Sequence, residues 1–358
     1  MGDAKESGTS PTRRGIDTLG LRRATLGLAD HVADAVAVGE AVEGLPSGED
    51  VANVLVLGMG ASGAVGDVLD AVGELFLPIP LVVAKGYDAP SFVGADTLVV
   101  AVSHSGDTEE TLVAAEEAQQ AGARLLVVSS GGRLAEMAAE WGAPIAPVPT
   151  DLVSSRSALG AMAVPPLVCL ERMGLFPGAH GWIQAAVDQL RARAQELESD
   201  RSPAAALARK LGRSLPIVYS AGAVGRVAAQ RWKAQINEHA KTPAFANVLP
   251  EAGHNEVVGW GQHGDLTRQV FQMVFLRHDE EHPQQARRFT ALESVLDEVV
   301  GGIHTIQAAG EGALAQLLDL ALVGDVVSLE LAAQEGLDPG PEPVLADIDR
   351  LAAESSRR

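Results

Sequence analysis

The residues of chemical interest begin with a hydroxyl-rich segment, Val102-Ser-His-Ser-Gly-Asp-Thr-Glu-Glu-Thr111, between a predicted strand and a predicted helix. Its hydroxyls, Ser103, Ser105 and Thr108, lie around a glycine that lets the backbone turn its N–H groups toward a common point. Hydroxyls, free N–H groups and a helix N-terminus together bind an anion without any lysine. The alternative is a helix N-cap formed by Ser105 or Asp107, which accounts for fewer of the three hydroxyls. We therefore predict a phosphate-binding segment.

A glycine-rich turn, Gly58-Met-Gly-Ala-Ser-Gly63, follows an earlier predicted strand. It satisfies the G-x-G-x-x-G pattern of a dinucleotide site, but such a site also needs an acid after the next strand, which here ends Val83-Ala-Lys-Gly86. A tight turn without a ligand and a turn that touches a phosphosugar are the other interpretations. We favour the phosphosugar, with Gly60, Ala61 and Ser62 next to it, and expect no cofactor.

Two acid–base candidates follow in a third segment. Glu238 ends a predicted helix in Gln235-Ile-Asn-Glu-His-Ala-Lys-Thr-Pro-Ala244, and His254 lies in a glycine-containing loop. Moving a proton between adjacent carbons of a sugar needs a carboxylate base, and ring opening needs a second group that carries the ring-oxygen proton. Taken singly, a glutamate near a helix end is more often a solvated surface acid, and a lone histidine a loop residue.

The composition limits the partners of the protein. The formal net charge is -20 and no cluster of Lys and Arg is present, so we expect no nucleic-acid partner. A phosphorylated ligand would have to be held locally, by backbone N–H groups and one or two cations. The run His278-Asp-Glu-Glu-His282 is expected to be a solvated loop, and we predict no metal site.

The start of the chain and its single cysteine indicate a cytoplasmic protein. Residues 1–11 are polar, and no stretch reaches the roughly 18 uninterrupted apolar residues of a membrane span, so we expect no membrane partner. Cys169 lies in an apolar run, where a buried, unreactive thiol is the expected state.

Alternation of apolar strands with helical patterns predicts an α/β fold with doubly wound parallel sheets. The 358 residues, of which 47% are hydrophobic, suffice for two cores. The expected parts are an N-terminal helical segment (1–48), a first α/β domain (49–155), a helical connector (156–212) and a second α/β domain with C-terminal helices (213–358). Strands are predicted at 54–57, 79–84, 97–102, 124–129, 145–148, 216–220, 269–276 and 303–307.

Four motifs appear in an order that resembles the bifunctional phosphoglucose/phosphomannose isomerases. They are Gly-Met-Gly-x-Ser-Gly, Ser-x-Ser-Gly-x-Thr-Glu-Glu-Thr, Ile-Asn-Glu-x-Ala-Lys-x-Pro-Ala and Glu-x-x-His-Asn-Glu. The resemblance covers residues from about 50 to 350. It implies two SIS (sugar isomerase) domains, each a three-layer αβα unit. It also implies a metal-independent aldose–ketose isomerase that interconverts glucose 6-phosphate, mannose 6-phosphate or both with fructose 6-phosphate through a cis-enediol.

The resemblance also implies roles for individual residues. Ser103, Ser105 and Thr108 would hold the phosphate of the hexose. Glu238 would transfer the proton between C1 and C2. Two further residues would act on the sugar, His254 in ring opening and Arg156, in Ser155-Arg-Ser-Ala-Leu-Gly160, in stabilising the enediol. The family acts as a homodimer, in which the histidine reaches the neighbouring subunit's site.

The chain departs from the family pattern at three places. Ala61 replaces a glycine, the stretch Asp338-Pro-Gly-Pro-Glu-Pro-Val344 lacks the threonine tied to accepting mannose, and the last helix has Arg350 but no lysine. The alternative function is a regulatory or catalytically silent phosphosugar-binding SIS protein. It would keep the hydroxyl segment but would not need Glu238 and His254 together.

Overall fold

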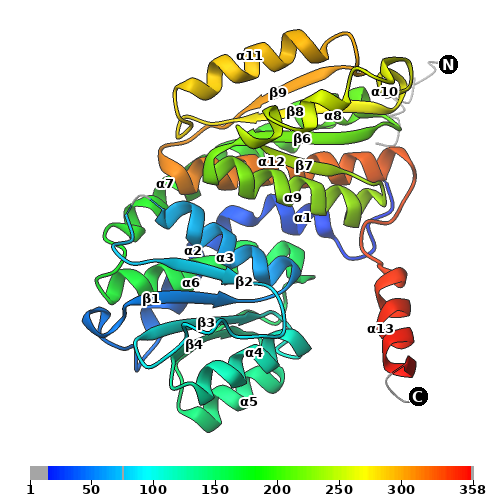
Figure 1. Cartoon of the computed structure of the whole chain (residues 1–358). Helices are drawn as coiled ribbons and strands as arrows, with labels where there is room; N and C mark the ends of the chain where they lie inside the picture. Colours follow the sequence, from blue (N-terminus) through cyan, green and yellow to red (C-terminus); the bar gives the residue numbers. More distant parts are fainter. Residues whose placement is uncertain (1–14, 75, 356–358) are drawn as a thin grey trace, which may run out of the picture.

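The computed structural model describes residues 15–74 and 76–355 of the chain (Figure 1). Residues 1–14 and 356–358, which belong to the outermost predicted segments, lie outside the described residues. The described helices and short 3-10 turns, the latter labelled η, are α1 (Leu21–Leu26), α2 (Leu28–Ala41), η1 (Gly48–Asp50), α3 (Gly60–Gly73), α4 (Glu109–Gln120), α5 (Gly132–Trp141), η2 (Ser155–Ala158), α6 (Leu159–Arg172), α7 (Ala179–Leu197), α8 (Pro203–Leu211), α9 (Gly222–Ala240), η3 (Glu251–Gly253), η4 (Glu256–Gly259), α10 (Gly264–Val270), α11 (Gln284–Leu296), α12 (Gly312–Gln334) and α13 (Pro343–Ser355).

The first sheet is parallel and has five strands in the order β2-β1-β3-β4-β5. Its strands are β1 (Asn53–Leu57), β2 (Leu81–Ala84), β3 (Thr97–Ser103), β4 (Arg124–Ser129) and β5 (Ile145–Pro147). Side chains alternate between its faces: Val54 and Val56 pack toward α3 and α6, whereas Leu55 and Leu57 pack toward α4 and α5. Burial on both faces explains the nearly continuous apolar strands.

The second sheet is also parallel and has four strands in the order β7-β6-β8-β9. They are β6 (Leu215–Ala221), β7 (Phe245–Leu249), β8 (Phe271–Arg277) and β9 (Ile303–Gln307). Strand β7 was not predicted from the sequence, because this edge strand is only partly buried and lacks a strong apolar run. The predicted start of β8 at 269 was early, since α10 extends to Val270.

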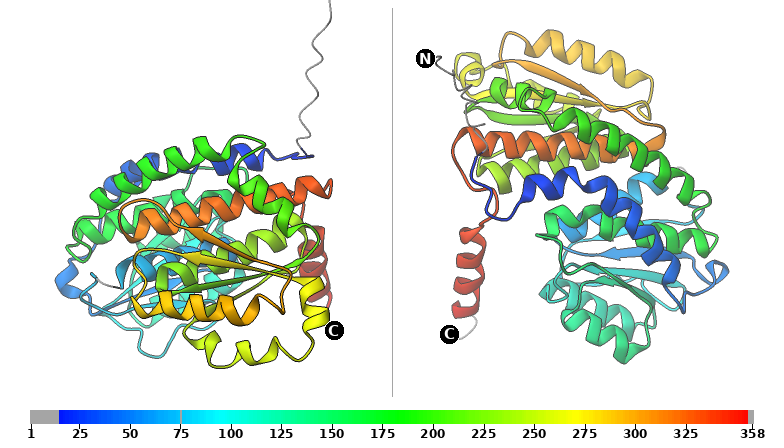
Figure 2. Two further views of the ribbon diagram at one scale, coloured as in Figure 1. Left: turned by 90° about the horizontal axis from the view of Figure 1, so that it is seen from above. Right: turned by 180° about the vertical axis from the view of Figure 1, so that it is seen from behind.

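Helices α9 and α12 cover one face of the second sheet, and α11 covers the other (Figures 1 and 2). Among the described helices, α12 alone is long and apolar enough to span a membrane, but 94% of its most apolar window is buried in the protein. It packs against α7, α8 and α9 and is therefore a core helix. The predicted fold class, two doubly wound parallel sheets with an N-terminal helical segment, is confirmed.

One hydrophobic cluster extends from the first sheet through α3, α6 and α9 to α12 and the second sheet. The two sheets therefore share a core. The exact limits of the domains at 48/49, 155/156 and 212/213 stay a prediction.

The joint between α9 and α12 predicts a stability effect at Gly324. A Cβ built at Gly324 would lie 2.3 Å from the indole of Trp232, which is fully buried and donates to the Leu320 carbonyl at 2.7 Å. We expect Gly324→Ala to lower the free energy of unfolding by about 1–3 kcal/mol. Chemical denaturation of the wild type and the variant measures this change in the free energy of unfolding.

The matched control is Gly181→Ala on α7, where an added Cβ meets no atom within 4 Å. At that position the better helix propensity of alanine should raise the free energy of unfolding by about 0.5–1 kcal/mol. Equal effects of the two substitutions would contradict the role of the indole.

Candidate functional site

Two antiparallel helices, α3 and α9, bring the predicted site residues together. Arg226 at the start of α9 binds Asp70 near the end of α3, with Nη2 to Oδ2 at 2.8 Å. At the opposite ends, the Ser62 hydroxyl in the first turn of α3 lies 3.8 Å from Met162 Sδ of α6, which directly follows η2, and Arg156 of η2 pairs with Glu238 on the last turn of α9. The C-terminal end of α9 therefore lies beside the N-terminal end of α3, where Gly60 begins the helix.

The hydroxyl segment forms a compact loop after β3. The Ser103 hydroxyl, which is fully buried, lies 2.9 Å from the Thr108 hydroxyl and accepts from the Gly106 N–H at 3.1 Å. Gly106 has φ 79°, and a Cβ there would lie 1.8 Å from the Gly131 carbonyl oxygen, so no other residue fits. Ser103 thus holds the loop, whereas Ser105 is exposed and Thr108 half-buried.

These hydroxyls do not form the N-terminal cap of helix α4. The N-cap residue of α4 is Thr108, and its side chain makes no capping hydrogen bond. Ser105 accepts from the Asp107 N–H at 3.2 Å, and Asp107 accepts from the Arg133 N–H of α5 at 2.9 Å. The first N–H groups of α4 are therefore left without a side-chain acceptor, as an anion-binding helix end requires.

The first glycine-rich turn touches this loop. The Ser62 hydroxyl accepts from the His104 N–H at 3.1 Å, and Ser62 is buried. Gly60, with φ 51°, is exposed, and Ala61 is half-buried. Two helix N-termini, those of α3 and α4, therefore begin next to each other at the carboxyl edge of the first sheet, the edge at which ligands bind in open α/β sheets.

Arg156 is the buried cation at this edge. Its side chain is 7% exposed, and its Nε lies 3.5 Å from Glu238 Oε2. Its Nη1 and Nη2 donate to the carbonyls of Pro339 and Gly340 at 3.2 and 2.9 Å, and Nη1 lies 3.4 Å from Glu342 Oε1. Residues 338–342, called the C-terminal strap below, are thus fastened over the site.

A second buried cation supports the first. Arg231, seven residues before Glu238 on α9, forms a two-oxygen pair with Asp325 of α12, with Nη2 to Oδ2 at 2.6 Å. Its Nη2 also donates to the Arg156 carbonyl at 2.8 Å. Asp325 and Arg231 therefore fix the backbone from which the Arg156 side chain projects.

The environment of Glu238 suits a base. Burial raises the pKa of Glu238 above its usual value, and the negative charges of Glu342 and Asp325 add to this. The positive charges of Arg156 and Arg231 act in the opposite direction. The net direction is upward, toward the range in which a carboxyl group both accepts and returns a proton.

Lys241 is a neighbour of Glu238 that was not among the predicted site residues. It ends α9 in the left-handed conformation, with φ 54°, and its Nζ donates to the Glu238 carbonyl. Burial lowers the pKa of Lys241. Its place in the Ile-Asn-Glu-x-Ala-Lys motif, three residues after Glu238, was the signal available in the sequence.

His254 is not part of this group of residues. It follows β7 and η3 in a segment whose Ala252 and Trp260 pack on the face of the second sheet opposite α9. Its side chain is exposed and, within the described part of the chain, has no hydrogen-bond or ion-pair partner. The second sheet therefore separates His254 from Glu238 within one chain.

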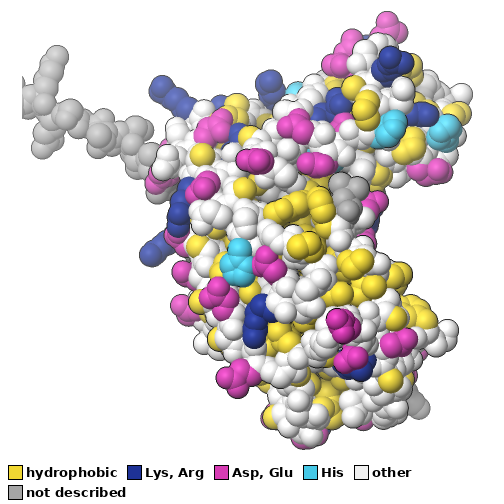
Figure 3. Space-filling view, turned by 90° about the vertical axis from the view of Figure 1, so that its left-hand side faces the viewer, with side chains coloured by type: hydrophobic (Ala, Val, Ile, Leu, Met, Phe, Trp, Pro, Cys, Tyr) yellow, Lys and Arg dark blue, Asp and Glu magenta, His cyan; other side chains and the backbone are white. Residues whose placement is uncertain are grey.

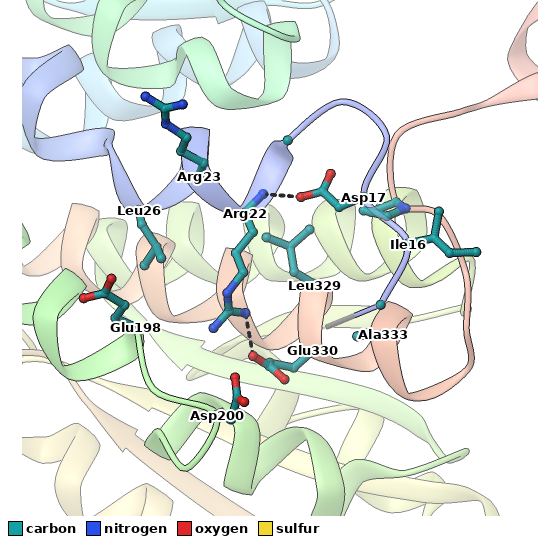
Figure 4. A pocket seen from close by; sticks show the side chains of 13 residues that line it. Ile16, Asp17, Arg22, Arg23, Leu26, Glu198, Asp200, Leu329, Glu330 and Ala333 are labelled. Carbon is teal, nitrogen blue, oxygen red and sulfur yellow. Dashed lines mark hydrogen bonds and ion pairs between the residues drawn. The ribbon is translucent and has the colours of Figure 1, made fainter. Parts of the chain in front are cut away.

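A pocket of about 470 Å³ lies elsewhere, between α1, α12 and the α7–α8 turn (Figure 4). None of the predicted site residues lines it, and two of its charged side chains, Arg22 and Glu330, bind each other at 2.5 Å. The face in Figure 3 has Lys and Arg scattered among Asp and Glu, without a continuous basic surface. The described residues contain no group of three or more His, Cys, Asp and Glu side chains that could hold a metal ion.

Comparison with known proteins decides the family. Residues 49–162 match the SIS domain, and residues 200–351 match the bacterial phospho-glucose isomerase C-terminal SIS domain. The bifunctional phosphoglucose/phosphomannose isomerase of Caldicellulosiruptor bescii is 34% identical over 318 residues, which cover 88% of this chain and 93% of that protein. The protein of the same name from Aquifex aeolicus is 33% identical over 304 residues, covering 84% and 89%. This chain belongs to the bifunctional phosphoglucose/phosphomannose isomerase family.

A solved structure agrees on the fold. The C-terminal domain of glucosamine-fructose-6-phosphate aminotransferase from Francisella tularensis superposes with a TM-score of 0.65 at 13% identity, covering 89% of this chain and 96% of that chain. At this identity the likeness concerns the arrangement of the two SIS domains alone. Family membership confirms the resemblance that the four sequence motifs indicated.

The buried ion pair behind the site predicts a double-mutant effect. Arg231→Met alone leaves the Asp325 carboxylate buried without its partner, so we expect the free energy of unfolding to fall by about 3–5 kcal/mol. Arg231→Met together with Asp325→Leu removes both charges and should recover most of that loss. Denaturant titration of the three proteins measures the effect, and a double variant no more stable than the single one would contradict it.

Proposed function

We propose that this protein is an aldose–ketose isomerase that interconverts glucose 6-phosphate, mannose 6-phosphate or both with fructose 6-phosphate. The observation that carries the proposal is the half-buried carboxyl group of Glu238, paired with Arg156 beside the N-terminal ends of α3 and α4. A base, a cation and an anion-binding edge are the parts that a proton transfer between C1 and C2 of a phosphosugar requires. A phosphosugar-binding protein without isomerase activity is not favoured, because it would need the anion-binding edge but neither the base nor the cation.

In the proposed mechanism the phosphate binds to the hydroxyls of Ser105 and Thr108 and to the free N–H groups at the start of α4, while Ser103 holds the loop in shape. Gly60, Ala61 and Ser62 line the sugar. This arrangement suits a chain of net charge -20, because the positive field comes from backbone dipoles at one edge of one sheet.

The chemical step uses Glu238 and Arg156. The Glu238 carboxylate takes the proton from C2 of the open-chain aldose, and negative charge develops on O1. Arg156, a permanent cation whose Nε lies 3.5 Å from Glu238 Oε2, stabilises the resulting cis-enediol. Protonated Glu238 then returns its proton to C1, and the ketose is complete when the hydroxyl proton has left O2 and a proton has reached O1. None of these steps needs a metal or an organic cofactor.

We also propose that a second copy of the chain supplies His254 for ring opening, in a homodimer located in the cytoplasm. Two observations support the dimer. His254 is separated from its own Glu238 by the second sheet. Helix α13 stands apart from the rest of the chain (Figures 1 and 2), with an exposed apolar face that a second copy would cover. That face consists of Val344, Leu345, Ile348 and Leu351, each more than half exposed.

The first test is turnover. Wild-type protein is assayed for fructose 6-phosphate formed from glucose 6-phosphate and, separately, from mannose 6-phosphate, with a chelator present. We expect Glu238→Gln to lower kcat by at least about 100-fold, because an amide cannot accept the proton. Since burial raises the pKa of Glu238, wild-type kcat/KM should fall as the pH drops through a value above that of an ordinary glutamate.

The control is Glu335→Gln, which alters an exposed carboxylate paired with Arg213, a residue outside the candidate site, and should leave kcat unchanged. Wild-type protein that turns over neither sugar but still binds a phosphosugar would overturn the isomerase proposal. Comparing the turnover of glucose 6-phosphate with that of mannose 6-phosphate shows which epimers are accepted.

The second test is subunit complementation. Glu238→Gln and His254→Ala should each be inactive alone. Mixing equal amounts after dissociation should restore about a quarter of wild-type activity, since half of the dimers then hold one intact site of two. Mixtures that stay inactive although hybrid dimers form would show that His254 does not act across an interface.

A further inference from the structure

The C-terminal strap brings a second carboxylate into the candidate site. Glu342 Oε1 lies 3.4 Å from Nη1 of Arg156, and Glu238 Oε2 lies 3.5 Å from Nε of the same guanidinium group. The two glutamate side chains are 28% and 34% exposed, so both remain open to a ligand, whereas that of Arg156 is 7% exposed. One buried cation therefore holds two partly open carboxylates.

The strap that carries Glu342 is held at several points. The Thr18 hydroxyl and N–H donate to the Asp338 carboxylate at 2.6 and 3.3 Å, and the Gly340 N–H donates to it at 3.1 Å. Arg156 uses two of its five N–H groups on the carbonyls of Pro339 and Gly340. The remaining N–H groups of Arg156 are available to the two carboxylates and to a ligand between them.

The chemistry of an aldose–ketose conversion leaves a task that Glu238 does not perform. When C2 loses its proton, the carbonyl oxygen O1 gains negative charge and the hydroxyl on C2 keeps its own proton. The ketose forms only when that proton leaves O2 and a proton reaches O1. A group that accepts and returns a proton is needed beside these oxygens.

The other groups around Arg156 are poor carriers for that proton. The guanidinium of Arg156 does not give up a proton in proteins. Lys241 donates its Nζ to the Glu238 carbonyl. His239 is buried, lies 2.8 Å from the Ser328 hydroxyl through Nδ1, and has its pKa lowered to about 3 by that burial and by the nearby cations.

We propose that Glu342 is a second acid–base residue of the isomerisation, which carries the hydroxyl proton from O2 to O1 of the enediol. In this step the Glu342 carboxylate accepts the proton from O2, the C2–O2 bond becomes a carbonyl, and the C1–C2 double bond takes the proton of Glu238 at C1. Protonated Glu342 gives its proton to O1. Both carboxylates end the cycle ionised, and no other reactant is consumed. This proposal rests on the isomerase function proposed above.

The test separates the two proton transfers. In deuterated water, the hydrogen at C2 is exchanged when solvent deuterium replaces the proton on Glu238 before Glu238 returns it to C2, and this needs no ketose to form. Recovered glucose 6-phosphate is analysed for deuterium at C2, and fructose 6-phosphate is measured in the same samples. We expect Glu342→Gln to lower ketose formation by at least about 100-fold but exchange at C2 by less than about 10-fold.

Asp338→Asn serves as the matched control. It weakens the bonds from Thr18 to the strap without removing the proposed carrier, so exchange and ketose formation should change by the same factor. Parallel losses in Glu342→Gln as well would overturn the proposal and leave Glu342 as a strap anchor, and unchanged rates would also overturn it. Failure of the isomerase function itself is distinct, because wild-type protein would then show no exchange at C2.

Discussion

The structure around the candidate site depends on the burial of one guanidinium group. A cation removed from water is tolerated only where hydrogen-bond acceptors and opposite charges surround it. Arg156 meets that condition with two carbonyls of the strap and the carboxylates of Glu238 and Glu342. These partners come from α9 and from the C-terminus, so satisfying the charge also assembles the site.

The same requirement explains a chain that is acidic overall and yet suited to a phosphosugar. The first turns of α3 and α4 carry no side-chain cap, and Arg156 and Arg231 are buried, while the net charge of the whole chain is -20. Buried charges are screened far less than exposed ones, so a small number suffices. The buried pair of Arg231 and Asp325 keeps this cluster in position between α9 and α12.

The sheets impose a geometric constraint on acid–base chemistry within one chain. Successive residues of a strand face opposite sides, so Val218 packs toward α9 and Tyr219 toward the segment that ends at Trp260. Glu238 belongs to the first side and His254 to the second. This separation is what motivates the proposed dimer, and α13 has an exposed apolar face.

The sequence by itself determined the parallel α/β fold and indicated the segments of the candidate site, since these depend on local signals: apolar strands, glycine turns, hydroxyls before a helix and the Ile-Asn-Glu motif. The sequence did not reveal β7, because the partly buried residues of this strand show no clear alternation of apolar and polar side chains. Tertiary structure alone decided which residues meet. Glu342 reaches Arg156 across 186 positions of the chain, and Ser103 turns inward to hold its loop. Such contacts are set by helix packing and by the burial of charge, neither of which leaves a pattern in neighbouring residues.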